Sequence, residues 1–265
     1  MTSLIFDYDG SLASIGSDET LKRLFGILPI RIHHGLNETK SVIKKLIKPV
    51  KRKLEHPLLE DNPIVQEYFE LSDKANELQL EAIVFDTASA LGFQERNEIK
   101  TSRHIETMDQ RGWGYYADNL NMFIYNMCSL PIKTIFNVHS DRDKDVGEKV
   151  IEYPALKGSC KNEIQKWFDI ILFTKVIQDP ATKEASYSWL TKPEEGRFAK
   201  DRLGVLPAII PQDFSFIFGK YEEAGIVNPN ILVIGESGTG KSKALATMHG
   251  NSKKQLNQSN LKIAS

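Results

Sequence analysis

The 265-residue sequence predicts an α/β fold, with a mostly parallel sheet and helices on both of its faces. Short apolar runs of strand length, rich in β-branched and aromatic residues, recur along the chain, as is typical of buried parallel strands. Helical patterns lie between these runs, and such strand–helix alternation indicates a doubly wound sheet. The expected strands contain Leu4–Phe6, Ala82–Phe85, Thr134–Phe136, Ile170–Phe173 and Ile231–Ile234, and two of the expected helices contain Tyr116–Cys128 and Lys161–Trp167.

Length and composition favour one globular domain over residues 1–265. Hydrophobic residues make up 41% of the chain, which is enough for a normal core. The formal charge of −1 excludes a global basic field, so nucleic-acid binding would need a local patch. The acidic N-terminus does not resemble a signal peptide, and no apolar stretch approaches the ~18 residues of a membrane span. We therefore expect a cytoplasmic protein without a membrane partner. One disulfide between Cys128 and Cys160 is possible, but two reduced thiols are favoured.

Residues 27–80 interrupt the strand–helix alternation and are expected to form a helical, partly basic insertion. Lys40–Lys53 has seven Lys or Arg among fourteen residues, and an acidic helix-like segment, Glu67–Leu80, follows. The basic stretch is either a solvated helix that covers the sheet or a local surface for anions or nucleic acid. Pro49 would end or kink a helix there. At the other end of the chain, the Asn-, Ser- and Lys-rich residues 250–265 indicate a flexible tail or a return linker.

The strongest motif is a phosphate-binding loop that follows the last expected strand and precedes a helix start at Ala244–Met248. Its glycines let successive N–H groups point at phosphate oxygens. Lys241 would contact the β- and γ-phosphates, Ser242 would offer its hydroxyl to Mg²⁺, and the following helix start adds positive potential. This predicts binding and hydrolysis of ATP with Mg²⁺. The motif consists of Gly235, Glu236, Ser237, Gly238, Thr239, Gly240, Lys241 and Ser242.

The motif stands unusually late in the chain, because only 23 residues follow Ser242 and none of them is acidic. The carboxylate that a Mg²⁺ site needs must therefore come from upstream. The element order is then circularly permuted, or a neighbouring subunit completes the site. Asp86, at the end of an apolar strand and before Thr87, is the best candidate and would hold Mg²⁺ through water. The alternative is an Asp that caps the strand end.

Two further strand ends carry candidate catalytic residues. Asp9, next to Gly10, could orient and deprotonate the attacking water, although an Asp beside Gly is also common in turns. Asn137 and His139 follow the strand at Thr134–Phe136, at the edge where open α/β sheets bind ligands. His139 could donate a hydrogen bond to the γ-phosphate, or it could be structural.

These strand ends together resemble the RecA-fold ATPases, and most of all the small phage ATPases that act as RecA-like single-strand annealing proteins. Asp86 in VFDTASAL matches the Mg²⁺-holding Asp of that family, Asp7-Tyr8-Asp9 places the general base at Asp9, and His139 matches its γ-phosphate sensor. The matching order is cyclic, so the P-loop segment would have to move to the front. The resemblance implies a circularly permuted RecA-like fold and a phage protein in the host cytoplasm.

The resemblance extends to Ala199–Gly204, which is similar to the K-x-R-x-G element of the RadA and replicative-helicase branches. It implies that Lys200 and Arg202 are trans-acting fingers that reach a neighbour's nucleotide; alternatively they are exposed basic residues in a turn. It further implies a homo-oligomer with the nucleotide at the subunit interface, single-stranded DNA as partner, and a function in recombination, annealing or replication. The expected DNA loops are Glu95–Trp113 and Asp141–Lys149, although both are mixed in charge.

Three other functions are consistent with a P-loop. The first is a structural or assembly component that binds ATP with little turnover. The second is a permuted GTPase, which would need an N-K-x-D motif; the sequence has none, and Ser140–Asp143 is a poor substitute. The third is a small-molecule kinase, for which no lid or acceptor site is recognisable.

Overall fold

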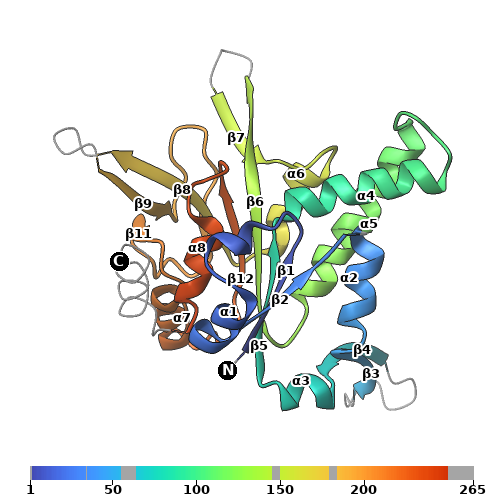
Figure 1. The fold of residues 1–265 in the computed structure, drawn as a ribbon, viewed down its shortest axis with the longest axis horizontal. Helices are drawn as coiled ribbons and strands as arrows, with labels where there is room; N and C mark the ends of the chain where they lie inside the picture. Colours follow the sequence, from blue (N-terminus) through green and yellow to red (C-terminus); the bar gives the residue numbers. More distant parts are fainter. Residues whose placement is uncertain (1, 34, 55–63, 145–149, 179–183, 250–265) are drawn as a thin grey trace.

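The computed structural model describes residues 2–33, 35–54, 64–144, 150–178 and 184–249. It contains a large sheet in the order β11-β9-β8-β12-β6-β5-β1-β2, with β10 paired to β8 and β7 paired to β6 (Figure 1). The strands β2, β1, β5, β6, β12 and β8 are all parallel to their neighbours in this series, which confirms the mostly parallel sheet. Their bounds are Ile27–Arg31, Thr2–Asp7, Leu80–Asp86, Lys133–Lys144, Asn230–Gly235 and Ile170–Gln178. The antiparallel strands are β7 (Val150–Pro154), β9 (Ala185–Leu190), β10 (Lys200–Asp201) and β11 (Ile209–Pro211).

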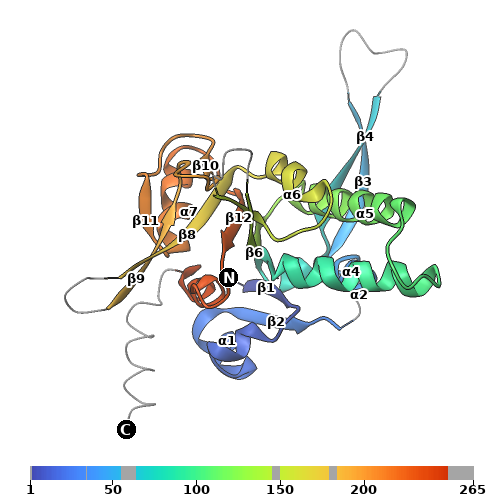
Figure 2. The same cartoon turned by 90° about the horizontal axis from the view of Figure 1, so that it is seen from above.

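Helices cover both faces of the sheet, as expected (Figures 1 and 2). Side chains alternate along each strand, so Leu4 and Phe6 pack into one buried cluster while Ile5 between them packs into the other. On the Phe6 face the rings of Phe6, Phe85 and Phe136 stack across neighbouring strands, with centroids 5.3 and 4.3 Å apart. That face carries α2 (Gly35–Ile43), α3 (Asp73–Glu77), α4 (Ala88–Ser102), α5 (Gln110–Cys128), α6 (Cys160–Glu163) and the 3₁₀ turn η2 (Ile164–Trp167). The Ile5 face carries α1 (Asp18–Phe25), α7 (Phe214–Glu223), α8 (Lys241–Ala244), and the 3₁₀ turns η1 (Ser11–Ser14) and η3 (Leu245–Thr247).

The structure corrects the helical expectation for residues 27–80. Residues 27–31 form β2 of the main sheet, next to β1. The helix expected over Lys40–Lys53 ends with α2 at Ile43, and β3 (Ile47–Leu54) then pairs antiparallel with β4 (Ile64–Leu71), where a helix was also expected. Pro49 lacks the N–H that a helix interior needs, but it is tolerated in a two-stranded ribbon, where it lies opposite Phe69.

The two segments expected to be DNA-binding loops also differ from that expectation. The segment Glu95–Trp113, expected to be a loop, consists largely of the end of α4 and the start of α5. Of Asp141–Lys149, the first residues continue β6 as far as Lys144, and the remainder lies outside the described residues, as does 250–265. Both cysteines are free thiols. Among the described helices, none combines the length and the apolar character needed to cross a membrane.

The strand that precedes the P-loop, β12, is the last strand among the described residues but lies inside the sheet, between β6 and β8. It runs parallel to both of them. Because the carboxyl ends of parallel strands meet at one edge of a sheet, the residues that follow β1, β5, β6 and β12 gather there.

Candidate nucleotide site

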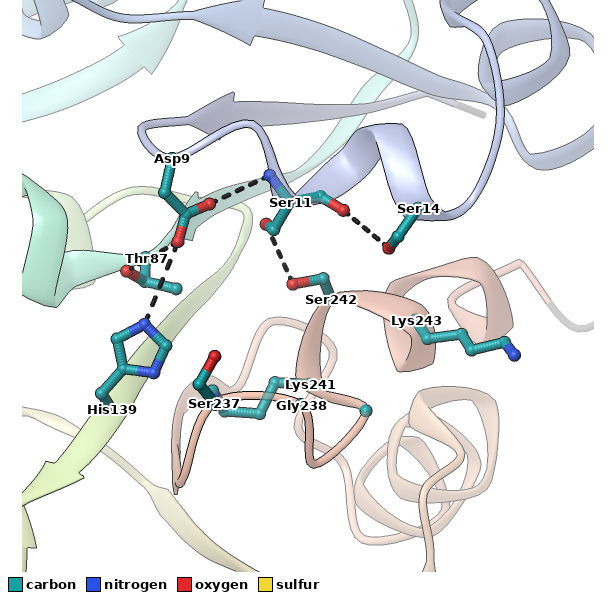
Figure 3. Close-up of a pocket in the computed structure, with 11 residues that line it drawn as sticks. Asp9, Ser11, Ser14, Thr87, His139, Ser237, Gly238, Lys241, Ser242 and Lys243 are labelled. Atoms are coloured by element: carbon teal, nitrogen blue, oxygen red, sulfur yellow. Dashed lines mark hydrogen bonds and ion pairs between the residues drawn. The ribbon is translucent and has the colours of Figure 1, made fainter.

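A cleft of about 240 Å³ lies at this carboxyl edge (Figure 3). Its walls come from four segments of the chain: the turn after β1, the start of α4 after β5, the continuation of β6, and the loop after β12. The residues that line it are Asp9, Ser11, Ser14, Thr87, His139, Ser237, Gly238, Gly240, Lys241, Ser242 and Lys243. Most of the residues predicted for the site therefore surround one cavity.

The P-loop has the backbone that its sequence predicts. Gly238 and Gly240 adopt left-handed conformations, with φ of 77° and 86°, which a side chain would disfavour. Gly235 has no room for a Cβ atom, since one built there would lie 2.7 Å from Thr174. Lys241 is buried, and its ammonium group donates hydrogen bonds to the carbonyl oxygens of Gly235 (2.8 Å) and Glu236 (2.7 Å). The lysine is thus held inside the loop whose N–H groups would bind phosphate.

Lys241 is a weaker base than an exposed lysine. Burial lowers the pKa of its ammonium group to about 8, while the nearby carboxylates of Asp86, Asp9 and Glu236 oppose this shift. Phosphate oxygens would add negative charge and favour the protonated form further.

A relay of hydroxyl groups joins the P-loop to Asp86. The Ser242 hydroxyl donates to Ser11 Oγ (3.1 Å), and the Ser11 hydroxyl donates to Asp86 Oδ2 (3.1 Å). The amide of Asn137 donates to the other carboxylate oxygen, Oδ1, also at 3.1 Å. Asp86 is completely buried, and burial raises the pKa of its carboxyl group, while the hydroxyl and amide groups around the carboxylate oppose this shift.

These residues fit a magnesium ion. Asp86 is a buried carboxylate whose hydrogen-bond donors are neutral, and such a group is stabilised by a cation. Ser242 supplies a hydroxyl oxygen on the P-loop side of the same relay. No group of three or more His, Cys, Asp or Glu suited to a metal occurs in the described part of the chain, and Mg²⁺ in nucleotide sites is normally held by one or two protein oxygens with phosphates and water.

Asp9 and His139 lie next to each other on one wall of the cleft (Figure 3). The carboxylate of Asp9 accepts a hydrogen bond from Ser11 N (3.0 Å) and a long one from the Thr87 hydroxyl (3.5 Å). His139 Nε2 lies 4.0 Å from Asp9 Oδ2. Burial and the charge of Lys241 lower the pKa of His139, with Asp9 opposing, so the imidazole is neutral at pH 7. Its Nδ1 is buried and has no hydrogen-bond partner within the described residues.

The turn that carries Asp9 is built by its neighbours. Asp7, at the end of β1, accepts a hydrogen bond from Gly10 N at 2.8 Å. Gly10 has φ of 77°, so the chain turns sharply and η1 begins at Ser11. This geometry directs Asp9 into the cleft and places Ser11 beneath it, against Asp86.

Lys200 and Arg202 do not belong to this cleft. In β10, Lys200 pairs with Ile171 near the amino end of β8, whereas the cleft is at the carboxyl edge. The Lys200 ammonium donates to the carbonyl of Phe168 (2.6 Å), and Arg202 forms an ion pair with Asp169 (2.7 Å). Within one chain, both residues stabilise the start of β8 through these contacts. Their function as trans-acting residues stays a prediction, because it requires a second subunit.

Ser11 and Arg142 contact predicted site residues but were not themselves predicted from the sequence. Ser11 links Asp86 and Ser242, and its position two residues after Asp9, in the segment D-Y-D-G-S, was the available signal. Arg142, on the continuation of β6, forms an ion pair with Glu236 of the P-loop. No sequence motif indicates that contact, because it depends on how far β6 extends beyond the sheet.

Comparison with protein families gives one match, to the family model described as AAA domain, over residues 2–203. Comparisons with curated proteins and with solved structures give no match. The matched region includes Asp86 and the cleft residues Asp9 and His139, and it ends before the P-loop that completes the cleft. An AAA domain agrees with the P-loop, the α/β sheet and the site at its carboxyl edge. The chain belongs to the AAA domain family of P-loop ATPases.

Proposed function

We propose that the protein binds ATP with Mg²⁺ in this cleft and hydrolyses it. The observation that carries the proposal is the convergence of Asp9 and His139 with Lys241 and Ser242 around one cavity, within a single chain. The buried Asp86 is joined to this cavity through the hydroxyl of Ser11. A loop that only bound phosphate would not require a carboxylate and an imidazole at the opposite wall. Asp86 and Ser242 would hold Mg²⁺, which when bound neutralises part of the charge on the phosphates.

The residues of the chain have distinct tasks in this reaction. Lys241 exchanges its bonds to the loop carbonyls for bonds to the β- and γ-phosphates and stabilises the charge that develops there. Asp9 orients a water molecule and accepts its proton as the water oxygen attacks the γ-phosphorus and the bond to ADP breaks. His139, neutral and with Nε2 beside Asp9 at the wall of the cleft, donates a hydrogen bond to the γ-phosphate.

The element order of this ATPase is circularly permuted relative to a RecA-like core. The central position of the last strand, β12, supports this proposal. So does the contact between Ser3 Oγ and His249 Nε2, 2.9 Å apart, because it brings the two ends of the described chain together. A gene that joins the C-terminus to residue 2 and opens the exposed turn at Val227 should give a folded protein that binds ATP. Failure of that protein to fold or bind ATP would argue against the permuted order.

The ATPase acts on single-stranded DNA in recombination, annealing or replication. The support is the resemblance of the strand-end motifs to the phage RecA-like proteins. The test is ATPase rate with and without single-stranded DNA, for wild type and Lys241→Ala. If single-stranded DNA stimulates the wild-type ATPase and Lys241→Ala abolishes this activity, the whole proposal is supported. Equal ATPase rates with and without DNA would refute the function on DNA. Binding of ATP without turnover would indicate a structural or assembly function, and turnover of GTP alone would indicate a permuted GTPase.

Lys200 and Arg202 complete the site of a neighbouring subunit in a homo-oligomer. Their exposure supports this only in part, since Arg202 is half-exposed and already paired with Asp169. Mixing inactive Lys241→Ala with inactive Arg202→Ala tests it, because mixed interfaces would contain one intact site and regain part of the activity. A strictly monomeric ATPase would refute the trans function.

A further inference from the structure

A second hollow, of about 450 Å³, opens on the other side of the P-loop. It shares Gly238, Gly240 and Lys243 with the catalytic cleft, so the two cavities are neighbours. The hydrolysis described above uses none of its remaining walls. The hollow is lined by Tyr187, Gln212, Gly238, Gly240, Lys243, Ala244 and Thr247.

The direction of the bound nucleotide follows from the catalytic residues. A nucleoside triphosphate is a linear molecule, and its γ-phosphate would lie at the wall of Asp9 and His139. The α-phosphate, ribose and base must then extend along the P-loop away from that wall. Figure 3 shows that Lys243 points away from Asp9 and His139, and Lys243 lies at the border of the second hollow. The nucleoside end of the ligand therefore leaves the cleft toward this hollow.

An aromatic ring forms part of the wall of the hollow. Tyr187 of β9 is 46% exposed, although Trp189, two residues on and thus on the same face of the strand, is completely buried against Phe214. The Tyr187 ring lies close to the P-loop, with Cδ1 3.9 Å from the position that a Cβ of Gly240 would occupy. The ring thus stands at the margin of the core, beside the phosphate cradle.

The other walls combine apolar surface with a fixed amide. The Thr247 hydroxyl donates to the carbonyl of Ala244 (2.7 Å) and accepts from Phe214 N (2.8 Å). The amide nitrogen of Gln212 donates to the carbonyl of Thr239 at 3.1 Å, and its oxygen Oε1 would lie 2.7 Å from a Cβ on Gly240. Gln212 is therefore anchored to the P-loop, with its oxygen directed at the backbone of Gly240.

We propose that this hollow binds the heterocyclic base and the ribose of the nucleotide, with the base stacked on the ring of Tyr187. An aromatic side chain beside methyl groups and one oriented amide matches a flat, apolar-faced base with polar edges. The inference rests on the proposed function, because the phosphates must occupy the P-loop. If the base stacks on Tyr187, the affinity for a ligand without a base should not depend on Tyr187.

Calorimetric titration with ATP and with inorganic tripolyphosphate tests the inference. Tyr187→Ala is expected to weaken ATP binding about 5- to 150-fold, the range of an aromatic–base stack, and to leave tripolyphosphate binding unchanged. Tyr187→Phe keeps the ring and should bind ATP as wild type does. Tyr115→Ala is the matched control, since Tyr115 on α5 is 48% exposed and distant from the P-loop in sequence and fold. Lys241→Ala should weaken the binding of both ATP and tripolyphosphate.

The outcomes separate the two proposals. Wild-type ATP affinity in Tyr187→Ala would overturn the base site while leaving the phosphate site intact. An equal loss of affinity for ATP and for tripolyphosphate in Tyr187→Ala would also overturn the base site, because the ring would then only support the P-loop. No binding of either ligand by wild type would overturn the nucleotide site and the base site together.

Discussion

The nucleotide cleft and the turn that carries Lys200 and Arg202 occupy different ends of one sheet, and they are held in different ways. In the cleft, hydrogen bonds join residues far apart in sequence: Ser242 bonds to Ser11, and Ser11 to Asp86. In the turn, Lys200 and Arg202 bond to Phe168 and Asp169, which adjoin the strand that β10 pairs with. The difference shows that a parallel sheet itself brings the ends of its strands together, so residues at those ends meet in one site. The motif of Lys200 and Arg202 is not at such a strand end, and the sheet does not direct it to the cleft. The following measurements test whether the cleft alone performs the chemistry.

The largest expected effect concerns Asp9. In Asp9→Asn the side chain can still accept the hydrogen bond from Ser11 N, but it loses the basic oxygen that would take the proton of water. We expect kcat of ATP hydrolysis to fall about 10²- to 10⁴-fold, with ATP affinity little changed. The matched control is Asp18→Asn, because Asp18 pairs with Arg31 on the exposed surface of α1. If kcat is undiminished in Asp9→Asn, Asp9 is not the general base.

A smaller effect is expected at the magnesium site. Asp86→Asn preserves the shape of the side chain but removes its charge, so the Mg²⁺ concentration for half-maximal activity should rise about 10- to 100-fold. Ser11→Ala removes one hydrogen bond to Asp86 and one from Ser242, and it should raise that concentration about two- to tenfold. Ser102→Ala, at the far end of α4, is the control. If Ser11→Ala leaves the Mg²⁺ dependence unchanged, the hydroxyl relay has no function in metal binding.

Next in size is the pH dependence of nucleotide binding. The pKa of Lys241 is lowered to about 8 in the free protein, from 10.5, whereas bound phosphate favours the charged amine. Binding above pH 8 must therefore take up a proton, and affinity should fall about tenfold per pH unit there while staying level near pH 7. The lowered pKa of His139 keeps that residue neutral throughout this range. Calorimetry with ADP from pH 7 to 9.5 measures the effect, and Lys241→Ala should abolish the slope.

Most of the cleft could be predicted from the sequence, since β5 ends at Asp86 and β12 at Gly235, as expected. The strand expected to end at Asn137 instead continues to Lys144. In segment 27–80, α2 and α3 are helical as expected, but β3 and β4 were predicted as helix. Val42, Ile43, Leu46 and Ile47 have helical spacing, whereas the pairing of β3 with β4 is a non-local contact that a periodicity does not reveal.

The base hollow was likewise beyond sequence reasoning. It depends on how closely Tyr187 approaches Gly240, which is 53 positions later in the sequence. No motif encodes that approach, because it results from the packing of β9 beside the P-loop.

The smallest expected effect is that of Arg202→Ala on stability. Arg202 is about half exposed, and a solvent-screened ion pair contributes about 0–1 kcal/mol. Asp169 keeps another partner in the variant, the backbone N–H of Asn230 at 3.0 Å, so the free energy of unfolding in urea should change by less than about 1 kcal/mol. Measured together, stability and turnover then decide between the two functions of this residue. If turnover stays at the wild-type level, Arg202 only fastens the start of β8, and the cleft of one chain is complete. If turnover collapses while stability does not, the arginine reaches a neighbouring subunit's nucleotide, because no contact inside its own chain connects it to the cleft among the described residues.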